Sequence, residues 1–281
     1  MAKTQQGTEN IGFIGAGNMA NSLIRGMLAK GFLPQQLFAS DLDSSKLDTL
    51  KLECSIQVGS SANLVAQCDV IVLAVKPQVM EKVCKQLSLS FGDQAPLVIS
   101  IAAGITCNHL SSWLGPNTPI VRCMPNTPSL VGQGASGLFA LSIVTEAQRR
   151  LCQTLMSSVG KSVWVERETD IDSVTALSGS GPAYFFLFME AMQDSAIAMG
   201  LTPEVARVLT YQTALGAAEL ALSSTDSTAE LRSKVTSPGG TTEKAIESFE
   251  AGGLRQLVDS ALRAAQKRSV SLAAELGNDA T

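Results

Sequence analysis

Short apolar runs alternate with helical stretches over roughly the first 165 residues of the chain. The candidate strands are Ile11–Ile14, Leu37–Ala39, Ser55–Val58, Val70–Val75, Leu97–Ile101 and Pro119–Cys123. Helices are expected between them at 18–30, 45–52, 62–67, 79–87 and 106–113. The run Val70–Val75 is apolar without alternation, which is typical of a strand covered on both faces. Repeated βα units with such strands predict a parallel, doubly wound sheet.

The pattern of hydrophobic and polar residues changes after Val165. Two further strands are expected at Gly137–Leu141 and Ser162–Val165, with a helix between them. A charged connector, ERETDID, follows, and no convincing strand comes after it. The remainder is predicted to form long helices at 182–199, 203–223, 228–235, 241–250 and 254–276. We therefore expect a domain at 9–167 and an all-α domain at 168–277.

The helices of the second half carry more apolar side chains than one small bundle needs to bury. Many of these side chains are Met or Leu, namely Met189, Met192, Met199, Leu209, Leu215, Leu220 and Leu222. An ordinary helical core is one interpretation. Helix exchange in a homodimer is the interpretation we favour.

Composition narrows the functional classes. The 281 residues are 45% hydrophobic and 16% charged, with a net charge of −4, which offers no electrostatic footprint for nucleic acid. No apolar stretch approaches the ~20 residues that cross a bilayer, and the polar start lacks a secretion signal, so we expect a cytoplasmic protein.

The scarcity of metal-binding residues narrows the chemistry further. The one histidine, His109, excludes mechanisms that need two imidazoles, and a surface or capping role is expected for it. The six cysteines are scattered without a CxxC pair, so we expect buried free thiols and no metal site.

The segment IGFIGAGNMA predicts a dinucleotide site. Gly15 and Gly17 directly follow the first strand and precede a helix. The first glycine permits the tight turn, and the second lets the backbone approach a pyrophosphate at the helix N-terminus. Ala20 replaces the third glycine of the fingerprint, and Ala16 lies within the turn. A simple tight βα turn is the alternative interpretation.

The ends of two other strands are expected beside the same ligand. Asp41 would accept hydrogen bonds from free ribose hydroxyls and repel a 2′-phosphate, whereas Ser40 could donate to such a phosphate. Asp41 could also be only a helix cap. Lys76, in the run Ala74-Val75-Lys76-Pro77, could reach the cofactor or simply be a solvated lysine.

Two glycine-rich turns in the helical half predict a second site. The first is SGSGPAY, in which Pro182 follows glycines that expose unpaired N–H groups at a helix start. The second is SPGGTT, from Ser237 through Gly239, Gly240 and Thr241 to Thr242. Consecutive small residues at a helix N-terminus form a concave set of N–H donors that suits an anion. A substrate carboxylate is the better expectation there, because no phosphate-loop lysine pattern is present.

These motifs together resemble one family. IGFIGAGNMA, AVKP, SIAAG, MPNTP, GSGPAY and VTSPGGTT occur in the order found in the pyrroline-5-carboxylate reductase family. The resemblance implies an α/β fold in which an N-terminal Rossmann-type domain precedes a C-terminal helical domain that interlocks two subunits, with dimers often assembling into decamers. It further implies reduction of 1-pyrroline-5-carboxylate to L-proline with NADPH or NADH, the last step of proline synthesis.

The resemblance also implies roles for particular residues. It places Gly15, Gly17, Asn18 and Met19 at the cofactor phosphates, and Ala74, Lys76, Pro77, Ala102 and Ala103 near the nicotinamide ribose. It matches Gly240, Thr241 and Thr242 to a loop that binds the substrate carboxylate, with Thr242 at the ring nitrogen. Glu168 aligns with an acidic residue near the substrate.

The chain departs from the family pattern at two positions. Asp41 stands where some members that use NADPH have a serine, which argues for NADH. Lys234 replaces an asparagine that lies near the cofactor in some members.

Two rival functions remain open at this point. One is a dehydrogenase for another imine or a 3-hydroxyacid; hydroxyacid enzymes of similar architecture use a lysine on the central helix, and 182–200 contains none. The other is a non-catalytic NAD(P)-binding module, which would not need both SPGGTT and GSGPAY.

Overall fold

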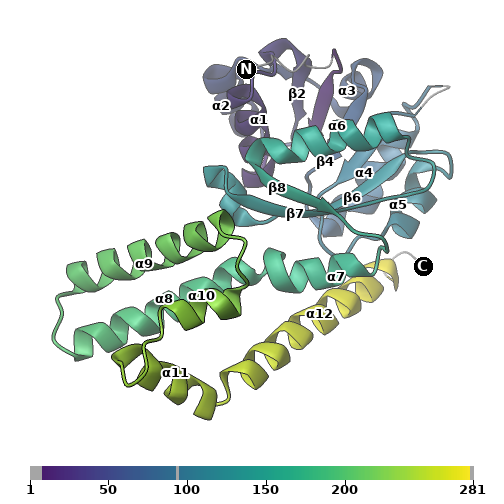
Figure 1. The fold of residues 1–281 in the computed structure, drawn as a ribbon. Coiled ribbons are helices and arrows are strands. Elements are labelled where there is room, and N and C mark those ends of the chain that lie inside the picture. The colour runs from purple at the N-terminus through teal and green to yellow at the C-terminus, as the bar shows by residue number, and fades with distance from the viewer. Residues whose placement is uncertain (1–7, 93–94, 279–281) are drawn as a thin grey trace. The chain divides into compact units, whose positions relative to one another are not determined.

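The computed structural model describes residues 8–92 and 95–278. These residues contain an eight-stranded sheet in the order β3-β2-β1-β4-β5-β6-β7-β8 (Figure 1). Its strands are β1 (Ile11–Ile14), β2 (Leu37–Ser40), β3 (Gln57–Val58), β4 (Val70–Leu73), β5 (Leu97–Ser100), β6 (Ile120–Met124), β7 (Gly134–Ala140) and β8 (Gly160–Trp164). The predicted doubly wound sheet is confirmed, and its order reverses between β1 and β4.

One pair of strands departs from the predicted parallel pairing. Six of the seven strand pairs are parallel, whereas β6 and β7 are antiparallel, with Arg122 opposite Phe139. The connection between them spans only residues 125–133, including the short 3-10 helix η2 (Thr127–Val131). A parallel crossover requires about a dozen residues or more, so this short connection returns the chain antiparallel.

Helices cover the sheet on both faces. They are α1 (Asn18–Ala29), α2 (Ser44–Cys54), α3 (Ser61–Gln67), α4 (Pro77–Ser88), α5 (Cys107–Leu114) and α6 (Glu146–Met156), with short 3-10 turns η1 (Pro34–Gln36) and η3 (Ser157–Val159). One core cluster joins α1, α2 and α6 to one face, and the other joins α3, α4 and α5 to the opposite face. Strands covered on both sides explain the unbroken apolar runs in the sequence.

The charged connector predicted after Val165 contains a helix that sequence patterns missed. Helix α7 (Asp170–Val174) continues into the π-helical turn η4 (Thr175–Gly179). Val174 packs so closely on β7 that a Cβ on Gly137 would lie 2.7 Å from its methyl carbons. Ile171 anchors α7 with 1% of its surface exposed. A helix this short gives no periodic signal, because only one or two of its side chains enter the core.

The chain divides into two compact units, residues 1–180 with 264–281 and residues 181–263. The end of α12 (Leu254–Asn278) belongs to the first unit because Leu272 and Leu276 pack against Gly104. The sequence-based ranges 9–167 and 168–277 describe functional domains rather than compact units. Their bounds stay a prediction.

The second unit is built from α8 (Gly181–Ala198), α9 (Pro203–Ser223), α10 (Thr228–Lys234), α11 (Thr241–Ala251) and the first part of α12. Four successive residues of α8, Phe185 to Phe188, are 45% to 66% exposed, so apolar side chains point outward on every side of this helix. Most of the Met and Leu side chains singled out above are also exposed. The unit therefore leaves unburied the apolar surface that the sequence analysis anticipated.

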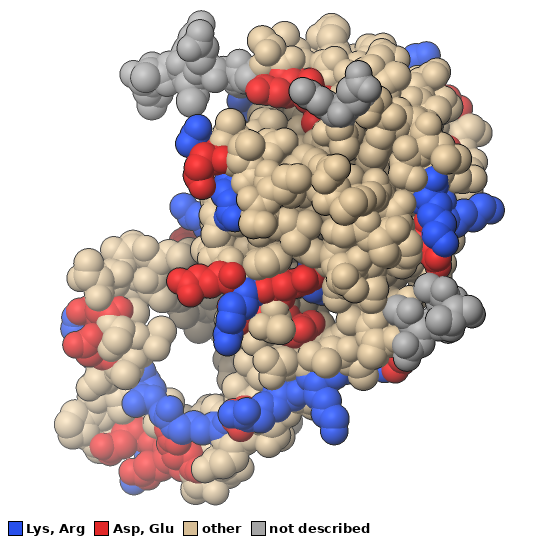
Figure 2. Space-filling model, turned by 90° about the vertical axis from the view of Figure 1, so that its right-hand side faces the viewer, with Lys and Arg blue, Asp and Glu red and all other residues tan. Residues whose placement is uncertain are grey.

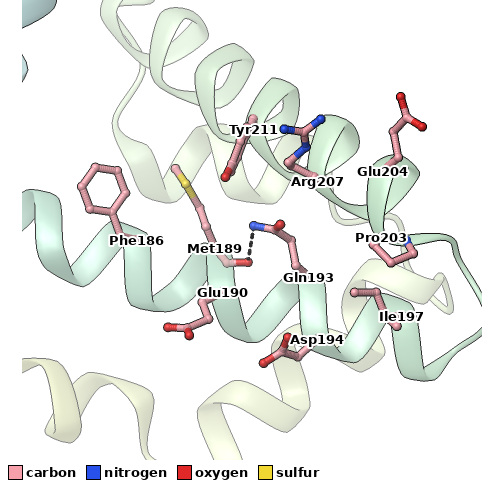
Figure 3. A pocket seen from close by; sticks show the side chains of 10 residues that line it. All are labelled: Phe186, Met189, Glu190, Gln193, Asp194, Ile197, Pro203, Glu204, Arg207 and Tyr211. Atoms are coloured by element: carbon pink, nitrogen blue, oxygen red, sulfur yellow. Dashed lines mark hydrogen bonds between the residues drawn. The ribbon is translucent and has the colours of Figure 1, made fainter.

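An open cavity of about 750 Å³ lies between α8 and α9. Met189 and Gln193 of α8 face Arg207 and Tyr211 of α9 there (Figure 3). Charged side chains of α11 and α12 form exposed pairs, such as Arg255 with Glu250 and Arg263 with Asp259. Figure 2 shows basic and acidic groups side by side on the face in view.

Among the helices that the structure describes, none has the length and apolar content to cross a membrane.

Candidate active site

The turn after β1 has the geometry of a dinucleotide-binding loop. Gly15 adopts φ +100° and donates its N–H to the Ser40 carbonyl oxygen at 2.7 Å. A Cβ at Gly15 would lie 2.6 Å from the Ala74 carbonyl oxygen, so only glycine fits between the two strand ends.

At Gly17, by contrast with Gly15, the space where a side chain would lie is open. Gly17 is the N-cap of α1 without a side-chain cap, and a Cβ there would meet no atom within 4 Å. The space in front of the first turn of α1 is thus open, and its amide N–H groups point into it. This cradle suits the pyrophosphate of a dinucleotide, because N–H donors and the helix dipole both favour an anion.

The remaining cofactor residues predicted from sequence gather at the same edge of the sheet. Because β1, β2, β4 and β5 are parallel, the residues after their carboxyl ends lie along one edge. Around Gly15 and Gly17 this edge carries Ala16, Asn18, Met19, Ser40, Asp41, Ala74, Val75, Lys76, Pro77, Ala102 and Ala103. Lys76 is exposed, and it is the N-cap of α4 with Pro77 in the first turn.

Asp41 is bound to the glycine turn itself. Its Oδ2 accepts the Ala16 N–H at 2.7 Å, and its Oδ1 accepts the Asp43 N–H at 2.9 Å. Asp43, and not Asp41, caps α2, because its side chain accepts from the Ser45 N–H. The interpretation of Asp41 as only a helix cap is therefore wrong.

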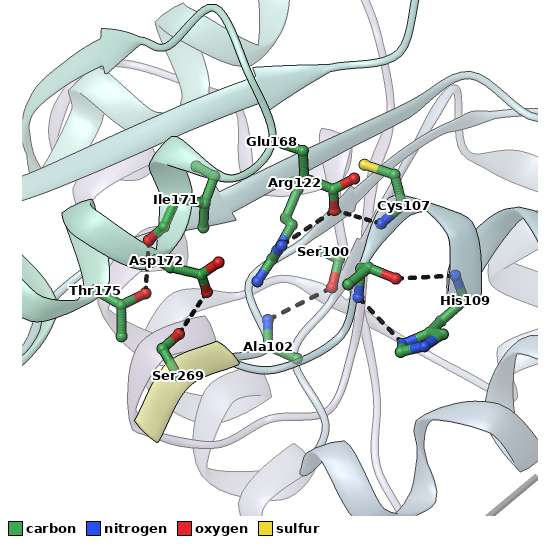
Figure 4. Close-up of polar contacts among 11 residues, drawn as sticks. Ser100, Ala102, Cys107, His109, Arg122, Glu168, Ile171, Asp172, Thr175 and Ser269 are labelled. Carbon is green, nitrogen blue, oxygen red and sulfur yellow. Dashed lines mark hydrogen bonds and ion pairs between the residues drawn. The ribbon is translucent and has the colours of Figure 1, made fainter. Parts of the chain in front are cut away.

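Glu168 lies in a polar cluster with Arg122 of β6 and Cys107 of α5 (Figure 4). Its Oε1 accepts the Cys107 N–H at 2.7 Å, at the start of α5, and Nη1 of Arg122 at 3.0 Å. Arg122 is 3% exposed, and its Nε is buried without a hydrogen-bond partner. Close by, Ser269 of α12 donates to Asp172 at 2.7 Å. The predicted contact of Glu168 with substrate stays a prediction, and its observed partners belong to the first unit.

Asn126, within MPNTP, joins two of the motifs. Its side chain donates to the Ser178 carbonyl oxygen at 3.0 Å and accepts the Ala135 N–H at 2.8 Å. Ser178 belongs to the π-helical turn, and Ser180 donates its N–H to the Thr175 carbonyl oxygen. SGSGPAY is thus a bulged turn rather than a plain helix start, and such bulges are frequent at functional sites. No sequence pattern predicts this role for Asn126.

The loop 237–242 lies in the second unit. Gly239 adopts φ +72° and donates its N–H to the Glu243 carboxylate at 2.8 Å, while Gly240 is the N-cap of α11 without a side-chain cap. Ser237 and Thr241 are exposed, and Thr242 is half-buried. The hydroxyls and first-turn amides of α11 form the donor set that a carboxylate needs.

The ionisable groups outside these sites have structural roles. His109 is in a capping box with Thr106, which confirms the expected capping role, and burial lowers the pKa of its imidazole. All six cysteines are free and buried, as expected, and burial raises the pKa of Cys68 and of Cys84 to about 12. The described residues contain no cluster of three or more His, Cys, Asp or Glu that could hold a metal ion. Lys234 pairs with Asp226.

Comparisons with known proteins agree in pointing to one family. A family model described as pyrroline-5-carboxylate reductase dimerisation matches residues 168–272, and one described as NADP oxidoreductase, coenzyme F420-dependent, matches residues 10–104. The chain is 53% identical to the pyrroline-5-carboxylate reductase of Pseudomonas aeruginosa, with 96% of this chain and 99% of that one covered.

Solved structures give the same picture. The pyrroline-5-carboxylate reductase of Coxiella burnetii matches with a TM-score of 0.92 and 46% identity, covering 95% of this chain and 99% of that one. The pyrroline carboxylate reductase of Plasmodium falciparum, solved with NADP bound, matches with a TM-score of 0.83 and 29% identity, covering 95% and 98%.

Proposed function

The chain belongs to the pyrroline-5-carboxylate reductase family, and from this premise we propose that it reduces 1-pyrroline-5-carboxylate to L-proline, with NADH or NADPH as hydride donor. The observation that carries the proposal is the nucleotide turn. Gly15 is confined by the Ala74 carbonyl oxygen, and Gly17 opens the start of α1 to an anion. A purely structural βα turn has no need for that open space.

The reaction is compatible with the residues that the chain offers. A cyclic imine is basic enough to take a proton near neutral pH, which activates its carbon towards hydride. The bound nicotinamide supplies that hydride. The chain must then hold the imine carbon against the cofactor, which is a positioning task. One C–H and one N–H bond form as the C=N double bond becomes single.

We assign the contact with the ring nitrogen of the substrate to Thr242. Its hydroxyl can donate to or accept from the ring nitrogen and pass a proton to water, while Ser237, Gly240 and Thr241 supply the carboxylate donors. The Gly239 N–H already donates a hydrogen bond to the Glu243 carboxylate. The substrate carboxylate therefore depends mainly on the amides and hydroxyls at the start of α11.

Self-association is the second part of the proposal. The exposed Phe185–Phe188 run lies in the segment that matches the family's dimerisation model. We propose that a second copy of the chain covers this surface in a homodimer, and that dimers can assemble further, up to a decamer. The buried, reduced cysteines fit a cytoplasmic enzyme.

Growth of a proline auxotroph that lacks this reductase tests the function. Expression of the chain should restore growth without proline. Expression of Gly17→Glu should not restore it, because a carboxylate would enter the cradle at the start of α1. Failure of the unaltered, soluble chain to support growth would argue for a non-catalytic NAD(P)-binding module.

A further inference from the structure

Asp41 lies where β2 ends, at the place in the nucleotide turn where an adenosine ribose is expected. Two backbone amides hold its carboxylate, the Ala16 N–H at 2.7 Å and the Asp43 N–H at 2.9 Å, one on each oxygen. These two bonds fix the carboxylate in position, because any rotation would break at least one of them. The charge therefore cannot easily turn away from an incoming ligand.

The bound carboxylate still has accepting capacity. An ionised carboxylate offers about four lone-pair sites, and the two backbone amides use two of them. Asp41 is half-buried, so the remaining sites are accessible. They can accept hydrogen bonds from the 2′- and 3′-hydroxyls of a ribose, which are donors, but not from a 2′-phosphate, which is an anion.

The neighbouring groups do not compensate for a second anion. Ser40 could have donated to a phosphate, but the residue is 7% exposed and its hydroxyl lies 3.0 Å from the Ser61 hydroxyl. Asp43 adds another carboxylate two residues further on. The ammonium of Lys46 lies 3.7 Å from that second carboxylate. A 2′-phosphate would carry a charge of about −1.5 to −2 into this acidic corner.

We propose that Asp41 selects the cofactor without a 2′-phosphate, so that the enzyme prefers NADH to NADPH. The inference rests on the proposed function, and it goes further by assigning the cofactor preference to one carboxylate. Like charges brought together at a binding site disfavour the ligand, so we expect a preference of about tenfold or more in kcat/KM.

Steady-state kinetics on the full-length chain test the assignment. kcat/KM for NADH and for NADPH is measured at a saturating concentration of the imine, in the wild type, Asp41→Asn and Asp41→Ser. Both variants should shift the ratio towards NADPH by about tenfold or more, mainly through a lower KM for NADPH. Asp43→Asn is the matched control, since it removes the same charge two residues away and asparagine also caps helices. It should change the ratio by less than about threefold.

A binding measurement keeps the test independent of catalysis. The wild-type chain is titrated with 5′-AMP and with 2′,5′-ADP, which differ by the 2′-phosphate. We expect 5′-AMP to bind more tightly. Tighter binding of 2′,5′-ADP, a wild-type preference for NADPH, or an unchanged ratio in Asp41→Asn would each overturn the assignment. If neither cofactor is oxidised in the presence of the imine while 5′-AMP still binds more tightly, the proposed function fails and the role of Asp41 stands.

Discussion

Among the residues that the structure describes, Glu168 is the one carboxylate bonded to the buried Arg122, and its replacement by alanine removes that partner. In the structure one oxygen of Glu168 serves both the guanidinium, at 3.0 Å, and the Cys107 N–H at the start of α5, at 2.7 Å. The Arg122 side chain is 3% exposed, so its charge has little hydration to compensate for the lost partner. We therefore expect the variant to be less stable than the wild type.

The size of the loss follows from burial. Breaking a buried ion pair costs about 3–5 kcal/mol, because an uncompensated charge remains. Glu168 is 26% exposed, and solvent screening reduces the loss to about 2–3 kcal/mol, below that range. The Cys107 amide loses its acceptor as well, which adds about 1 kcal/mol.

Urea unfolding followed by tryptophan fluorescence measures this loss. Both tryptophans, Trp113 and Trp164, lie in the first unit, so the signal reports on the unit that holds the ion pair. The midpoint should fall at a fixed protein concentration with little change in slope. In the double variant Arg122→Met/Glu168→Gln the loss should be smaller than in Glu168→Ala, because no charge is left buried. Asp259→Ala, which breaks an exposed pair with Arg263, should leave the midpoint unchanged.

The same variant separates two roles for Glu168. If the carboxylate acts through Arg122 and α5, the folded variant keeps its KM for the imine while its stability falls. A higher KM at unchanged stability would refute this reasoning and make Glu168 a direct substrate ligand.

Three further outcomes are expected. Thr242→Ala should lower kcat for the imine by about 10²-fold or more with nearly unchanged cofactor affinity, and Thr242→Ser should recover most of the rate; equal rates in all three proteins would remove this hydroxyl from the mechanism. The native thiols should resist 5,5′-dithiobis(2-nitrobenzoate) at pH 8, because burial raises their pKa, and all six should react after unfolding; a fast-reacting native thiol would contradict the burial. Burial lowers the pKa of His109, so below about pH 6.5 the unfolded chain binds the proton more readily and stability should fall between pH 7 and 5.5. Because this is the one histidine, His109→Gln should flatten that slope, and an unchanged slope would exclude the imidazole as its cause.

The nucleotide half of the site could be predicted because its signals are local. Gly15 and Gly17 follow a buried strand directly, and a strand, a turn and a helix in succession leave few alternative geometries. The apolar runs likewise predicted the doubly wound sheet. The excess of apolar residues on 182–223 anticipated the exposed faces of α8 and α9, because it depends on composition alone.

What could not be predicted depends on residues far apart in the chain. Arg122 and Glu168 are separated by 46 positions, and Asn126 and Ser178 by 52, so no local pattern links them. Asp41 shows the same limit on a smaller scale. Its position after β2 predicted a role at the ribose, but its bond to the Ala16 N–H depends on how two βα turns meet. Such pairs can be identified only in the folded structure, where the two residues lie side by side.

The most direct test of the central claim is the stoichiometry of the reaction. The purified chain is mixed with 1-pyrroline-5-carboxylate and a limiting amount of NADH or NADPH, and the loss of absorbance at about 340 nm is compared with the L-proline formed. We predict one proline for each reduced cofactor consumed, and no consumption without the imine. Cofactor binding without proline formation, or faster oxidation of a 3-hydroxyacid by NAD(P)⁺ than reduction of the imine, would contradict the account.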